Sequence, residues 1–536
     1  MPAIITSNFR TLNAQHFKEQ ISGSSVYVGI GKSDAWSLTT SDTTDSTSLS
    51  TEFPAKDHLD GLGEARANFI GMKKIISADI AHVVPRHTWT SGQTYVAWDS
   101  ADENIYDKKF YVVTSEFKVY KCIIAPAGAS SIQPTQTLTA PTAESDGYTW
   151  KYMYTISVAD AEKFLTNSYM PVKTVPLGAS ATVATASSTT TIVLTETVPD
   201  IGVGMTVTGT NVGSSKTVSA INGSVLTLSG APSGSVSGIL TFAYANDAAA
   251  EAQLSEADYA QYLNQKASRD ASTAGGIERL IVTAGGTGYT NNTNVAVTIT
   301  GDGTGATVTT TAGVTVASNA VTAITIANKG TNYRVADVVI SGGAGSDATA
   351  RAVIGPKAGH GVDPIAELGG FFVALNSKLD GNDGGDLTVG NDFRQITLVN
   401  EPRVYNATPL AGLTATADTL KATKALDFNS SATVSSYTVD ELIVGAGGAK
   451  AYVVEIDNSN GYLRYHQNSK TGYKDFSNGE VVTGQTSSQA DTLESSNATL
   501  APEVDNSSGE ILFLENREPI SRTTTQIEDI KVIIEF

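Results

Sequence analysis

The sequence predicts a mainly β, multidomain protein with a β-sandwich-like core, a few short helices and inserted small β-domains. Composition is the first reason: 49 glycines and abundant threonine and serine, with only 7% aromatic residues, favour strands and turns over long helices. The second is that all four tryptophans lie within residues 1–150, which indicates an aromatic core early in the chain. At 536 residues, the chain is also longer than one ordinary domain.

The last strand is predicted from strict alternation. Every second residue from Ile530 to Phe536 is apolar, so four apolar side chains share one face of a strand. Before it, the apolar run 511–514 predicts a buried strand and residues 516–519 a turn. An apolar end of this kind is stable only when it docks into a sheet, so we expect the two ends of the chain to fold together as one body.

Residues 1–176 are predicted to supply the first part of the core. Residues 62–72 have a helix-like pattern, and the stretch 110–124 carries two apolar strand runs. Ser157 and Asp160 resemble a capping box for a helix. The strand before that helix has period-two spacing, which places four aromatic side chains on one face: Tyr148, Trp150, Tyr152 and Tyr154.

Charge almost disappears after this segment. Residues 178–245 hold only three charged groups, Glu196, Asp200 and Lys216, and have the pattern of short strands joined by Gly or Pro turns. We therefore predict a small inserted β-domain. Residues 247–268 are Ala-rich with apolar residues near helical spacing, which predicts a connecting helix.

An internal repeat follows in residues 277–355. The segment GGTGY, ending at Tyr289, and the segment GTNY, ending at Tyr333, are each followed by an apolar strand run and a Gly-rich turn. The two tyrosines are 44 positions apart (333 − 289). Two copies are too few for a long solenoid, so we predict a compact β-domain of two similar units.

The complete predicted order is a core with inserted modules, since insertions at exposed loops leave a packed sheet undisturbed. Its segments are the first part of the core (1–176), a small β-domain (177–246), a connecting helix and linker (247–276), the two-unit Gly/Thr-rich β repeat domain (277–355), the second part of the core (356–410), a small β-barrel or sandwich (411–500) and the C-terminal core strands (501–536).

Five segments resemble, in the same order, motifs of one structural protein family. They are ITSNFRT (5–11), VVPRHTW (83–89), DGYTWKY (146–152), NDFRQI (391–396) and SGEILFLENREPI (508–520). The family is the baseplate wedge subunit of T-even-type contractile-tailed bacteriophages, and this chain resembles a cyanophage-like form enlarged by β insertions. The resemblance covers about half of the chain. It implies a virion protein of the contractile tail baseplate that joins other wedge proteins, as a homodimer, during assembly in the host cytoplasm.

Charge and cysteine content restrict the function classes. The net charge is −19, from 35 basic and 54 acidic residues, which disfavours a nucleic-acid partner. We expect no membrane span, because no apolar run of the required length of about 18 residues exists. The N-terminus also lacks the pattern of a signal peptide. Cys122 is the only cysteine, so neither an intrachain disulfide nor a cysteine zinc site is expected.

The residues that could be reactive are explained better by structural roles than by catalysis or ligand binding. Pro85 separates His82 from His87, which prevents one helical face from holding both. Cys122 lies in the apolar stretch VYKCIIA, as expected of a buried thiol rather than a nucleophile. The Gly-rich stretches 301–305 and 213–217 fit neither the Rossmann fingerprint nor the P-loop.

The acidic clusters are also explained better by structural roles than by a metal or catalytic site. The loop Asp380–Asp386 is oxygen-rich, but Gly384 and Asn391 stand where a calcium loop needs an oxygen ligand and a glutamate, so a solvated turn is expected. The carboxylate pairs Glu515/Glu518 and Glu528/Asp529 are interpreted as surface charge rather than as glycosidase acids.

We therefore expect a structural protein, not an enzyme, with no catalytic, cofactor-binding or metal-binding residues. The alternative is a carbohydrate-binding or carbohydrate-cleaving phage tail adhesin, because adhesins also use Gly/Thr-rich β modules. Location separates the two hypotheses. A wedge subunit lies between baseplate proteins, whereas an adhesin is peripheral and binds host glycan.

Overall fold

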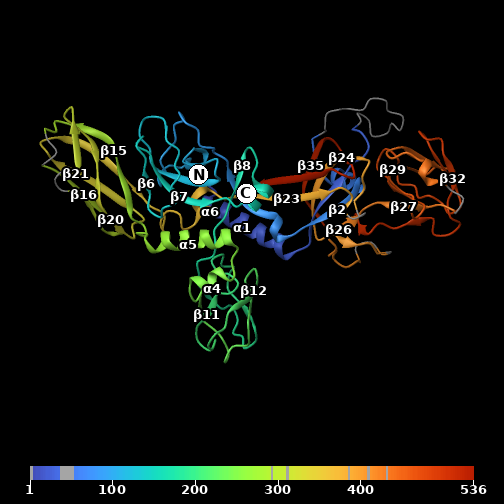
Figure 1. Ribbon diagram of the computed structural model, residues 1–536, viewed down its shortest axis with the longest axis horizontal. Helices are drawn as coiled ribbons and strands as arrows, with labels where there is room; N and C mark the ends of the chain where they lie inside the picture. The colour runs from blue at the N-terminus through green and yellow to red at the C-terminus, as the bar shows by residue number, and fades with distance from the viewer. Residues whose placement is uncertain are drawn as a thin grey trace. The chain divides into compact units, whose positions relative to one another are not determined.

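A computed structural model describes residues 4–36, 54–290, 294–309, 313–383, 387–406, 408, 411–429 and 433–536. It is mainly β, as predicted, with antiparallel sheets and a few helices (Figure 1). The chain divides into two compact units. The first contains Met1–His16, Ala81–Ala374 and Ile534–Phe536, and the second contains Phe17–Ile80 and Leu375–Ile533.

The first unit is built on a four-stranded sheet that is buried on both faces. Its order is β4 (Tyr111–Val113), β5 (Lys118–Ile124), β7 (Thr149–Thr155), β6 (Thr142–Ala143). One face contributes Val112, Tyr120 and Cys122 to a cluster with Tyr148 and Trp150, and the other contributes Tyr111, Val113 and Val119 to a cluster with Met153. The alternation along each strand thus supplies two cores, and Trp89, Trp98 and Trp150 lie in or against them, whereas Trp36 belongs to the second unit.

A bulge in β7 makes one sequence prediction wrong. Tyr148, Trp150 and Tyr152 pack in one cluster, but Tyr154 lies in the opposite one. In the pairing with β5, Val119 is opposite Tyr154 and Tyr120 is opposite Tyr152, so the residue between the two tyrosines is extra. One extra residue reverses the alternation beyond it, and Tyr154 therefore faces the other side of the sheet.

The helices of this unit begin at capping residues. The predicted helix after Ser157 is confirmed as α3 (Val158–Phe164), and the Ser157 hydroxyl accepts a hydrogen bond from the backbone N–H of Asp160. The connecting segment is two helices rather than one, α4 (Asp247–Glu251) and α5 (Glu256–Asp270), because Ser255 caps a new helix start. A short helix, α6 (Pro364–Leu368), follows later.

Both ends of the chain contribute to the first unit. Helix α1 (Ser7–Gly23) carries Arg10, which donates hydrogen bonds to the Phe536 carbonyl and to Glu535. The Phe536 N–H donates to the Phe371 carbonyl (3.1 Å). The ends therefore meet, as expected from the apolar C-terminal strand. Nearby, β3 (Ile80–Pro85) pairs with β8 (Tyr169–Val172).

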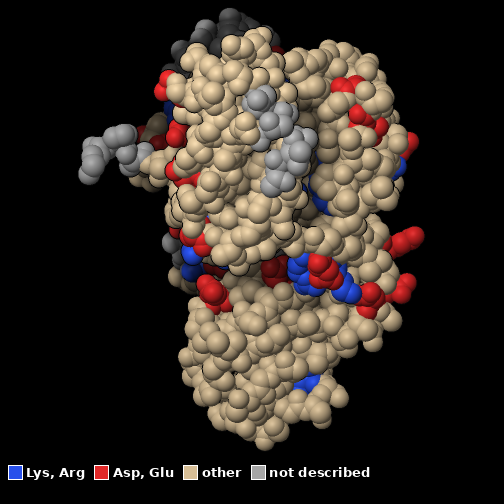
Figure 2. All heavy atoms as spheres, turned by 90° about the vertical axis from the view of Figure 1, so that its left-hand side faces the viewer, with Lys and Arg blue, Asp and Glu red and all other residues tan. Residues whose placement is uncertain are grey.

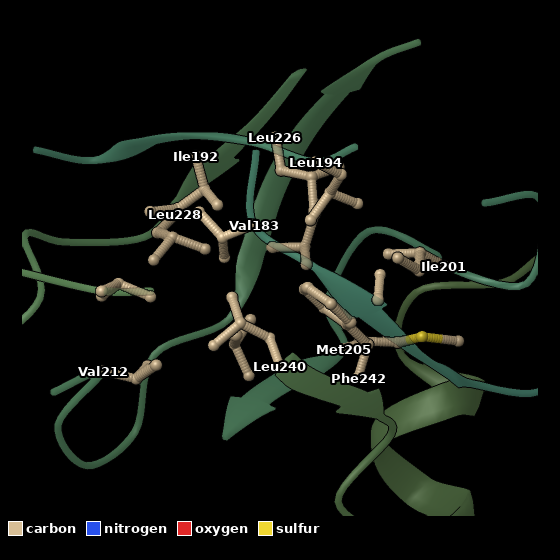
Figure 3. Packing of buried hydrophobic residues seen from close by; sticks show 14 residues of the cluster. Val183, Ile192, Leu194, Ile201, Met205, Val212, Leu226, Leu228, Leu240 and Phe242 are labelled. Carbon is tan, nitrogen blue, oxygen red and sulfur yellow. The ribbon is translucent and has the colours of Figure 1, made fainter. Parts of the chain in front are cut away.

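Residues 179–243 form a small sandwich of two three-stranded sheets. Their orders are β10 (Thr191–Val193), β13 (Val225–Leu228), β12 (Val218–Asn222) and β11 (Thr206–Thr208), β14 (Ile239–Ala243), β9 (Ala179–Thr182). One apolar cluster joins the sheets, with Ile192 and Leu226 from the first and Leu240 and Phe242 from the second (Figure 3). Figure 2 shows this sandwich as the lower body, and its visible surface carries almost no charged side chains.

The repeat domain is a nested set of antiparallel hairpins. The pairs are β15 (Ile277–Thr287) with β22 (Ser346–Ile354), β16 (Val295–Gly301) with β21 (Ala336–Gly342), β17 (Thr304–Val308) with β20 (Ile326–Thr331), and β18 (Val314–Ala317) with β19 (Ala320–Ile324) (Figure 1). The repeated tyrosines are buried, and each packs on the Gly-rich turn of the other repeat: Tyr289 on Gly345 and Tyr333 on Gly303. The two repeats therefore interlock.

The second unit is built on a five-stranded sheet of distant segments. Its order is β26 (Thr419–Lys421), β2 (Phe69–Ile75), β1 (Val26–Gly31), β24 (Asp392–Asn400), β35 (Glu510–Ser521). The helix predicted over 62–72 is partly wrong. Helix α2 (Leu59–Ala67) ends at Asn68, and the apolar residues after it join the sheet as β2. Packing thus overrides the local helical pattern.

The run 511–514 is a strand but not a buried one, since Leu512 is 44% exposed, and the turn predicted at 516–519 is also wrong. Strand β35 continues through it, and Phe393 is opposite Ile520 while Gln395 is opposite Asn516, so the strand bulges between these pairs. Because β35 is an edge strand, it tolerates Pro519 in this bulge. The final strand, β36 (Ile527–Glu535), has Ile530 and Val532 buried, as its alternation predicts. Strand β23 (Phe372–Asp380) passes from the first unit into the second.

Most of residues 411–500 form a seven-stranded antiparallel sheet. The order is β32 (Ala490–Thr492), β31 (Val481–Gly484), β28 (Leu442–Gly445), β29 (Lys450–Asp457), β30 (Tyr462–His466), β27 (Lys424–Asp427), β33 (Thr499–Leu500). A bridge between Phe428 and Leu493 joins the two sides of the sheet, which closes around a single apolar cluster. The short strands β25 (Arg403–Val404) and β34 (Val504–Asp505) pair next to the core.

Candidate functional site

The two histidines considered from sequence do not form a site. His82 is held by Gln15 (2.9 Å from Nε2) and the Gly370 carbonyl (2.9 Å from Nδ1). The His87 ring lies against Tyr111, with centroids 5.0 Å apart. Burial, together with Lys109, lowers the pKa of His87 to about 4.

Cys122 is fully buried in the first sheet. Its Sγ donates to the Ile124 carbonyl (3.4 Å), and burial raises the pKa of the thiol to about 12. A thiol held protonated in this way is a poor nucleophile. The Gly-rich stretch 301–305 contains a close-packed turn, because Gly303 lies under the ring of Tyr333.

The acidic candidates are also separated. Asp383 accepts a hydrogen bond from Lys73 (2.7 Å), while Asp386 lies outside the described residues. Glu528 is buried and paired with Arg522 (3.0 Å), so its interpretation as surface charge is wrong, whereas its neighbour Asp529 is exposed and bonds to Asn376. Among the described residues, no group of three or more His, Cys, Asp or Glu side chains is arranged to hold a metal ion.

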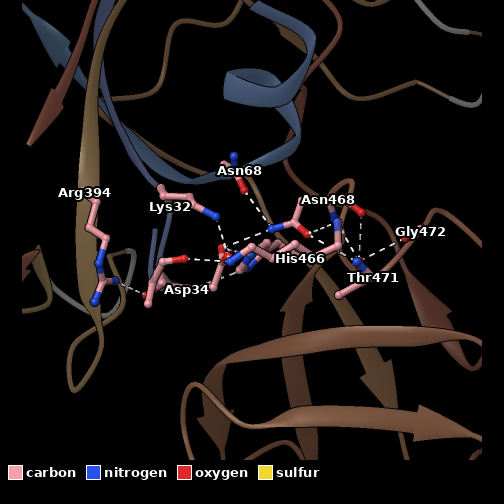
Figure 4. Close-up of polar contacts among 11 residues, drawn as sticks. Lys32, Asp34, Asn68, Arg394, His466, Asn468, Thr471 and Gly472 are labelled. Carbon is pink, nitrogen blue, oxygen red and sulfur yellow. Dashed lines mark hydrogen bonds and ion pairs between the residues drawn. The ribbon is translucent and has the colours of Figure 1, made fainter. Parts of the chain in front are cut away.

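The sequence did not reveal a buried polar network around Asp34 in the second unit (Figure 4). The Asp34 carboxylate pairs with Lys32, with Lys470 (3.0 Å) and, through Oδ1, with His466 (3.5 Å). Asn468 donates to both Asp34 Oδ1 and Asn68 Oδ1, each at 3.1 Å. One carboxylate therefore joins two ammonium groups, an imidazole and an amide.

Three chain segments bring these side chains together. Strand β1 ends at Gly31, where a Cβ would lie 2.7 Å from the Asn68 carbonyl oxygen, so the backbones approach closely. Lys32 then adopts a left-handed conformation (φ +63°), and its N–H donates to the same Asn68 carbonyl (3.0 Å). Strand β30 ends at His466, and the following turn places Asn468 and Lys470 next to Asp34.

The electrostatics of the network hold Asp34 ionised. Burial alone raises the pKa of Asp34, but Lys32, His466 and Lys470 together hold that pKa well below its ordinary value. Burial lowers the pKa of Lys32, an effect that Asp34 opposes and Lys470 reinforces. A carboxylate with such a low pKa is a poor general base, so the arrangement suits binding and positioning.

A cavity of about 380 Å³ adjoins this network. Lys32, Asn68 and Lys470 line it from the network side, and Gln395 and Asn516 line it from strands β24 and β35. Gln395 donates through Nε2 to Asn516 (2.9 Å). Both residues belong to the segments that carry the family resemblance.

No model of a known protein family matches the chain, and a search of the curated proteins finds no match either. No helix in the described part of the chain is both long and apolar enough to cross a membrane.

A second buried charged network lies in the first unit. The fully buried Lys121 donates to Glu367 (2.8 Å) and lies 4.4 Å above the centre of the Trp98 ring. Both ring nitrogens of His360 lie 3.7 Å from a carboxylate, of Glu278 on one side and Glu367 on the other. Burial raises the pKa of Glu367, but Lys121 and His360 lower it to about 2.

This second network joins the repeat domain to the core. Glu278 belongs to β15 of the repeat domain, whereas Lys121 belongs to β5 of the core sheet. Arg279 donates to the carbonyls of Trp98 (2.6 Å) and Ile123 (2.9 Å), also in the core. In each unit, therefore, an inserted β module is attached through charged side chains that are largely or fully buried.

Proposed function

We propose that this chain is a structural subunit of a contractile phage tail baseplate wedge that joins neighbouring wedge proteins during virion assembly. We further propose that it acts as a homodimer in the tail baseplate and performs no catalytic turnover. Interface burial supplies the free energy of such a joint.

The observation that supports this most is the pairing of the resembling segments. The segment 391–396 lies on β24 and the segment 508–520 on β35, and these strands are neighbours in the sheet. Gln395 is opposite Asn516, and their side chains share a hydrogen bond of 2.9 Å. Motifs that are over 100 residues apart in the chain thus meet residue to residue in one sheet.

In the first unit, too, the resembling segments are connected by hydrogen bonds. Trp89, of the segment 83–89, donates through Nε1 to Ser130 (3.2 Å). Ser130 donates in turn to Asp146, the first residue of the segment 146–152 (3.1 Å). Arg10, of the segment 5–11, contacts the last two residues of the chain. Each resembling segment therefore contributes to the core rather than to an inserted module.

The attachment of the repeat domain also suits a scaffold. Arg351, in β22, forms a two-pronged ion pair with Asp99 of the core, and Arg279 caps two core carbonyls. Bidentate arginine pairs fix orientation as well as distance. A joining subunit needs its modules in a fixed orientation, because a mobile module cannot position a neighbouring protein.

Location in the particle tests the proposal. Contractile tails of the virus that encodes this chain are purified and imaged at residue resolution, and the expected result is density for this chain between baseplate wedge proteins. Intact tails that lack the chain contradict the proposal. Light scattering of the purified protein separately tests the dimer, which has twice the chain mass of 55.8 kDa.

One observation favours the second candidate, a carbohydrate-binding tail adhesin. A cavity of about 680 Å³ in the first unit is lined by Trp98, Tyr333 and Arg334. Aromatic rings beside polar and cationic groups are a common lining for ligand sites. The Arg334 side chain is 90% exposed, so Arg334→Ala preserves the fold. Glycan-array binding that this substitution abolishes supports the adhesin function; no binding to any glycan contradicts it.

A further inference from the structure

We infer that the cavity next to Lys32 and Lys470 receives a single carboxylate-bearing residue of a partner protein, bound through its carboxylate and its backbone N–H. This inference rests on the proposed function, since it names the chemistry by which a joining subunit holds a neighbour. The site belongs to the second unit alone. Six residues carry the argument: Lys32, Trp36, Asn68, Gln395, Lys470 and Asn516.

The inner end of the cavity has a local excess of positive charge, although Asp60 and Glu64 at its mouth balance the charge of the lining as a whole. Lys32 binds Asp34 (Figure 4), and Lys470 binds the same carboxylate (3.0 Å), so two ammonium groups share one carboxylate. Their side chains are only 8% and 12% exposed, so water compensates little of the surplus positive charge. A ligand carboxylate in the cavity supplies the second counter-charge at the same place.

A buried acceptor calls for a donor on the same ligand. Gln395 is 6% exposed and lines the cavity. Its Nε2 is used by Asn516, but its Oε1 has no hydrogen-bond partner within the part of the chain that the structure describes. A buried carbonyl oxygen without a donor destabilises the protein, and a ligand N–H removes that penalty.

The amide of Asn68 adds a further donor. Its Oδ1 accepts from Asn468, which orients the side chain and leaves the Nδ2 group for other partners. Trp36, 8% exposed, provides an apolar wall for the carbon atoms of a ligand. The required ligand therefore has a carboxylate, a neighbouring N–H and a short apolar stem, which describes an acidic residue or a terminal carboxyl group of a peptide.

The mouth of the cavity limits the ligand to one carboxylate. Asp60 and Glu64 of α2 line it together with the exposed Lys56 and with His58. Two acidic side chains at the entrance repel a run of acidic residues but accept a neutral or basic flank. A single carboxylate that reaches past them meets Lys32 and Lys470.

Three small probes test the inference on the complete protein. N-acetylglycine carries both the carboxylate and the N–H, N-acetylglycinamide lacks the charge, and inorganic phosphate lacks the N–H. Calorimetry and saturation-transfer NMR are expected to show N-acetylglycine binding at least about tenfold more tightly than either of the others. Equal binding of the first two probes, binding of phosphate alone, or no binding of N-acetylglycine overturns the inference.

Substitutions then locate the site. Lys470→Gln is expected to weaken N-acetylglycine binding at least about tenfold, because one charge-assisted hydrogen bond is lost. If this variant does not fold by circular dichroism, Lys56→Gln at the exposed mouth replaces it, with an expected loss of about threefold. Lys109→Gln, an exposed lysine of the first unit, is the control and leaves binding unchanged. Unchanged binding in the folded cavity variants contradicts the assignment.

The outcome is independent of the test of the proposed function. Probe binding is measured on the purified protein, whereas the wedge assignment depends on the position of the chain in assembled tails. A chain that lies in the baseplate but does not bind N-acetylglycine refutes only the carboxylate site. A chain that binds the probe but is missing from tails refutes only the wedge assignment.

Discussion

The ring of Tyr289 lies so close to Gly345 that a Cβ on this glycine would come within 2.4 Å of the ring. The second repeat shows the reciprocal contact, because a Cβ on Gly303 would come within 2.4 Å of the ring of Tyr333. Neither glycine has a left-handed backbone conformation, so space alone requires the missing side chain: beside the tyrosine in both cases, and at Gly303 also beside the Thr331 carbonyl oxygen (2.5 Å). The repeats thus hold each other through two equivalent aromatic contacts.

We expect Gly345→Ala and Gly303→Ala each to destabilise the protein by about 1–3 kcal/mol, because an extra methyl group in a packed site forces the ring to move. Denaturant unfolding measures the loss. Gly128→Ala is the matched control, because no atom lies within 4 Å of its Cβ position, and it is expected to be neutral. Equal stability of all three variants contradicts the interlocked packing.

Arg10 joins the two ends of the chain through several contacts. Its guanidinium lies 3.6 Å from the centre of the Phe371 ring and donates to the Phe536 carbonyl and to Glu535. We expect Arg10→Ala to lower the free energy of unfolding by about 1–2 kcal/mol, through the loss of the cation–π contact and the carbonyl hydrogen bond. Glu535 is 61% exposed, so Glu535→Gln is the control and changes stability by less than about 0.5 kcal/mol. Equal effects of the two variants contradict the role given to Arg10.

Some predictions that rest on neighbouring residues hold in the structure, whereas the helix pattern of 62–72 and the turn signal of 516–519 are overridden by sheet pairing. Ser157 caps its helix because the cap and its N–H partner are three positions apart. Ile530 and Val532 are buried because a strand has a fixed period of two. The repeat is visible in the sequence because its Gly-Tyr pattern recurs. The sequence does not reveal that the tyrosine of each repeat packs on the Gly-rich turn of the other.

Features set by distant pairing were not predictable from the sequence. The bulge at Met153 depends on the register with β5, and it turned Tyr154 to the opposite face. Asp34 and Asn468 are 434 positions apart and sit in ordinary polar stretches, so neither marks a site. The sequence carries one partial signal, the Lys32-Ser33-Asp34 run directly after the apolar residues of β1, but the partners of this run depend on how the distant seven-stranded sheet packs.

Deletion of the closed seven-stranded sheet, here called the barrel, tests whether the rest of the second unit has a core of its own. Strand β26, at the start of 411–500, pairs with β2 of the core sheet. The Glu503 N–H donates to the Lys421 carbonyl (2.9 Å), and the Lys421 N–H donates to the Glu503 carboxylate (2.8 Å). The sequence places the insertion at 411–500, but its first strand, β26, belongs to the core sheet, so the deletion that tests the core begins at residue 424. Removing residues 424–500 and joining the ends with a short linker is expected to retain the near-UV circular dichroism of a packed core, and removing 411–500 is expected to give a less stable protein. A molten 424–500 deletion contradicts an independent core.

Asp440 provides a test of the electrostatics in the second unit. Burial, together with Asp392 and Asp34, raises the pKa of Asp440 to about 7. A carboxyl group whose pKa is raised on folding contributes stability below its unfolded pKa of about 4, and that contribution is lost as the pH rises toward 7. Asp440 has φ +66°, a conformation that asparagine also adopts, so Asp440→Asn keeps the backbone and the shape.

Asp440 is exposed to solvent, which screens its interactions, so we expect Asp440→Asn to stabilise the protein by no more than about 1 kcal/mol at pH 8 and to have almost no effect at pH 4, where aspartic acid is already neutral. Denaturant unfolding at the two pH values measures the difference, and the same variant at pH 4 is its own control for changes in packing. A gain of equal size at both pH values shows that the effect comes from packing rather than from charge. A loss at pH 8 shows that the ionised carboxylate is stabilised by its neighbours, contrary to the raised pKa.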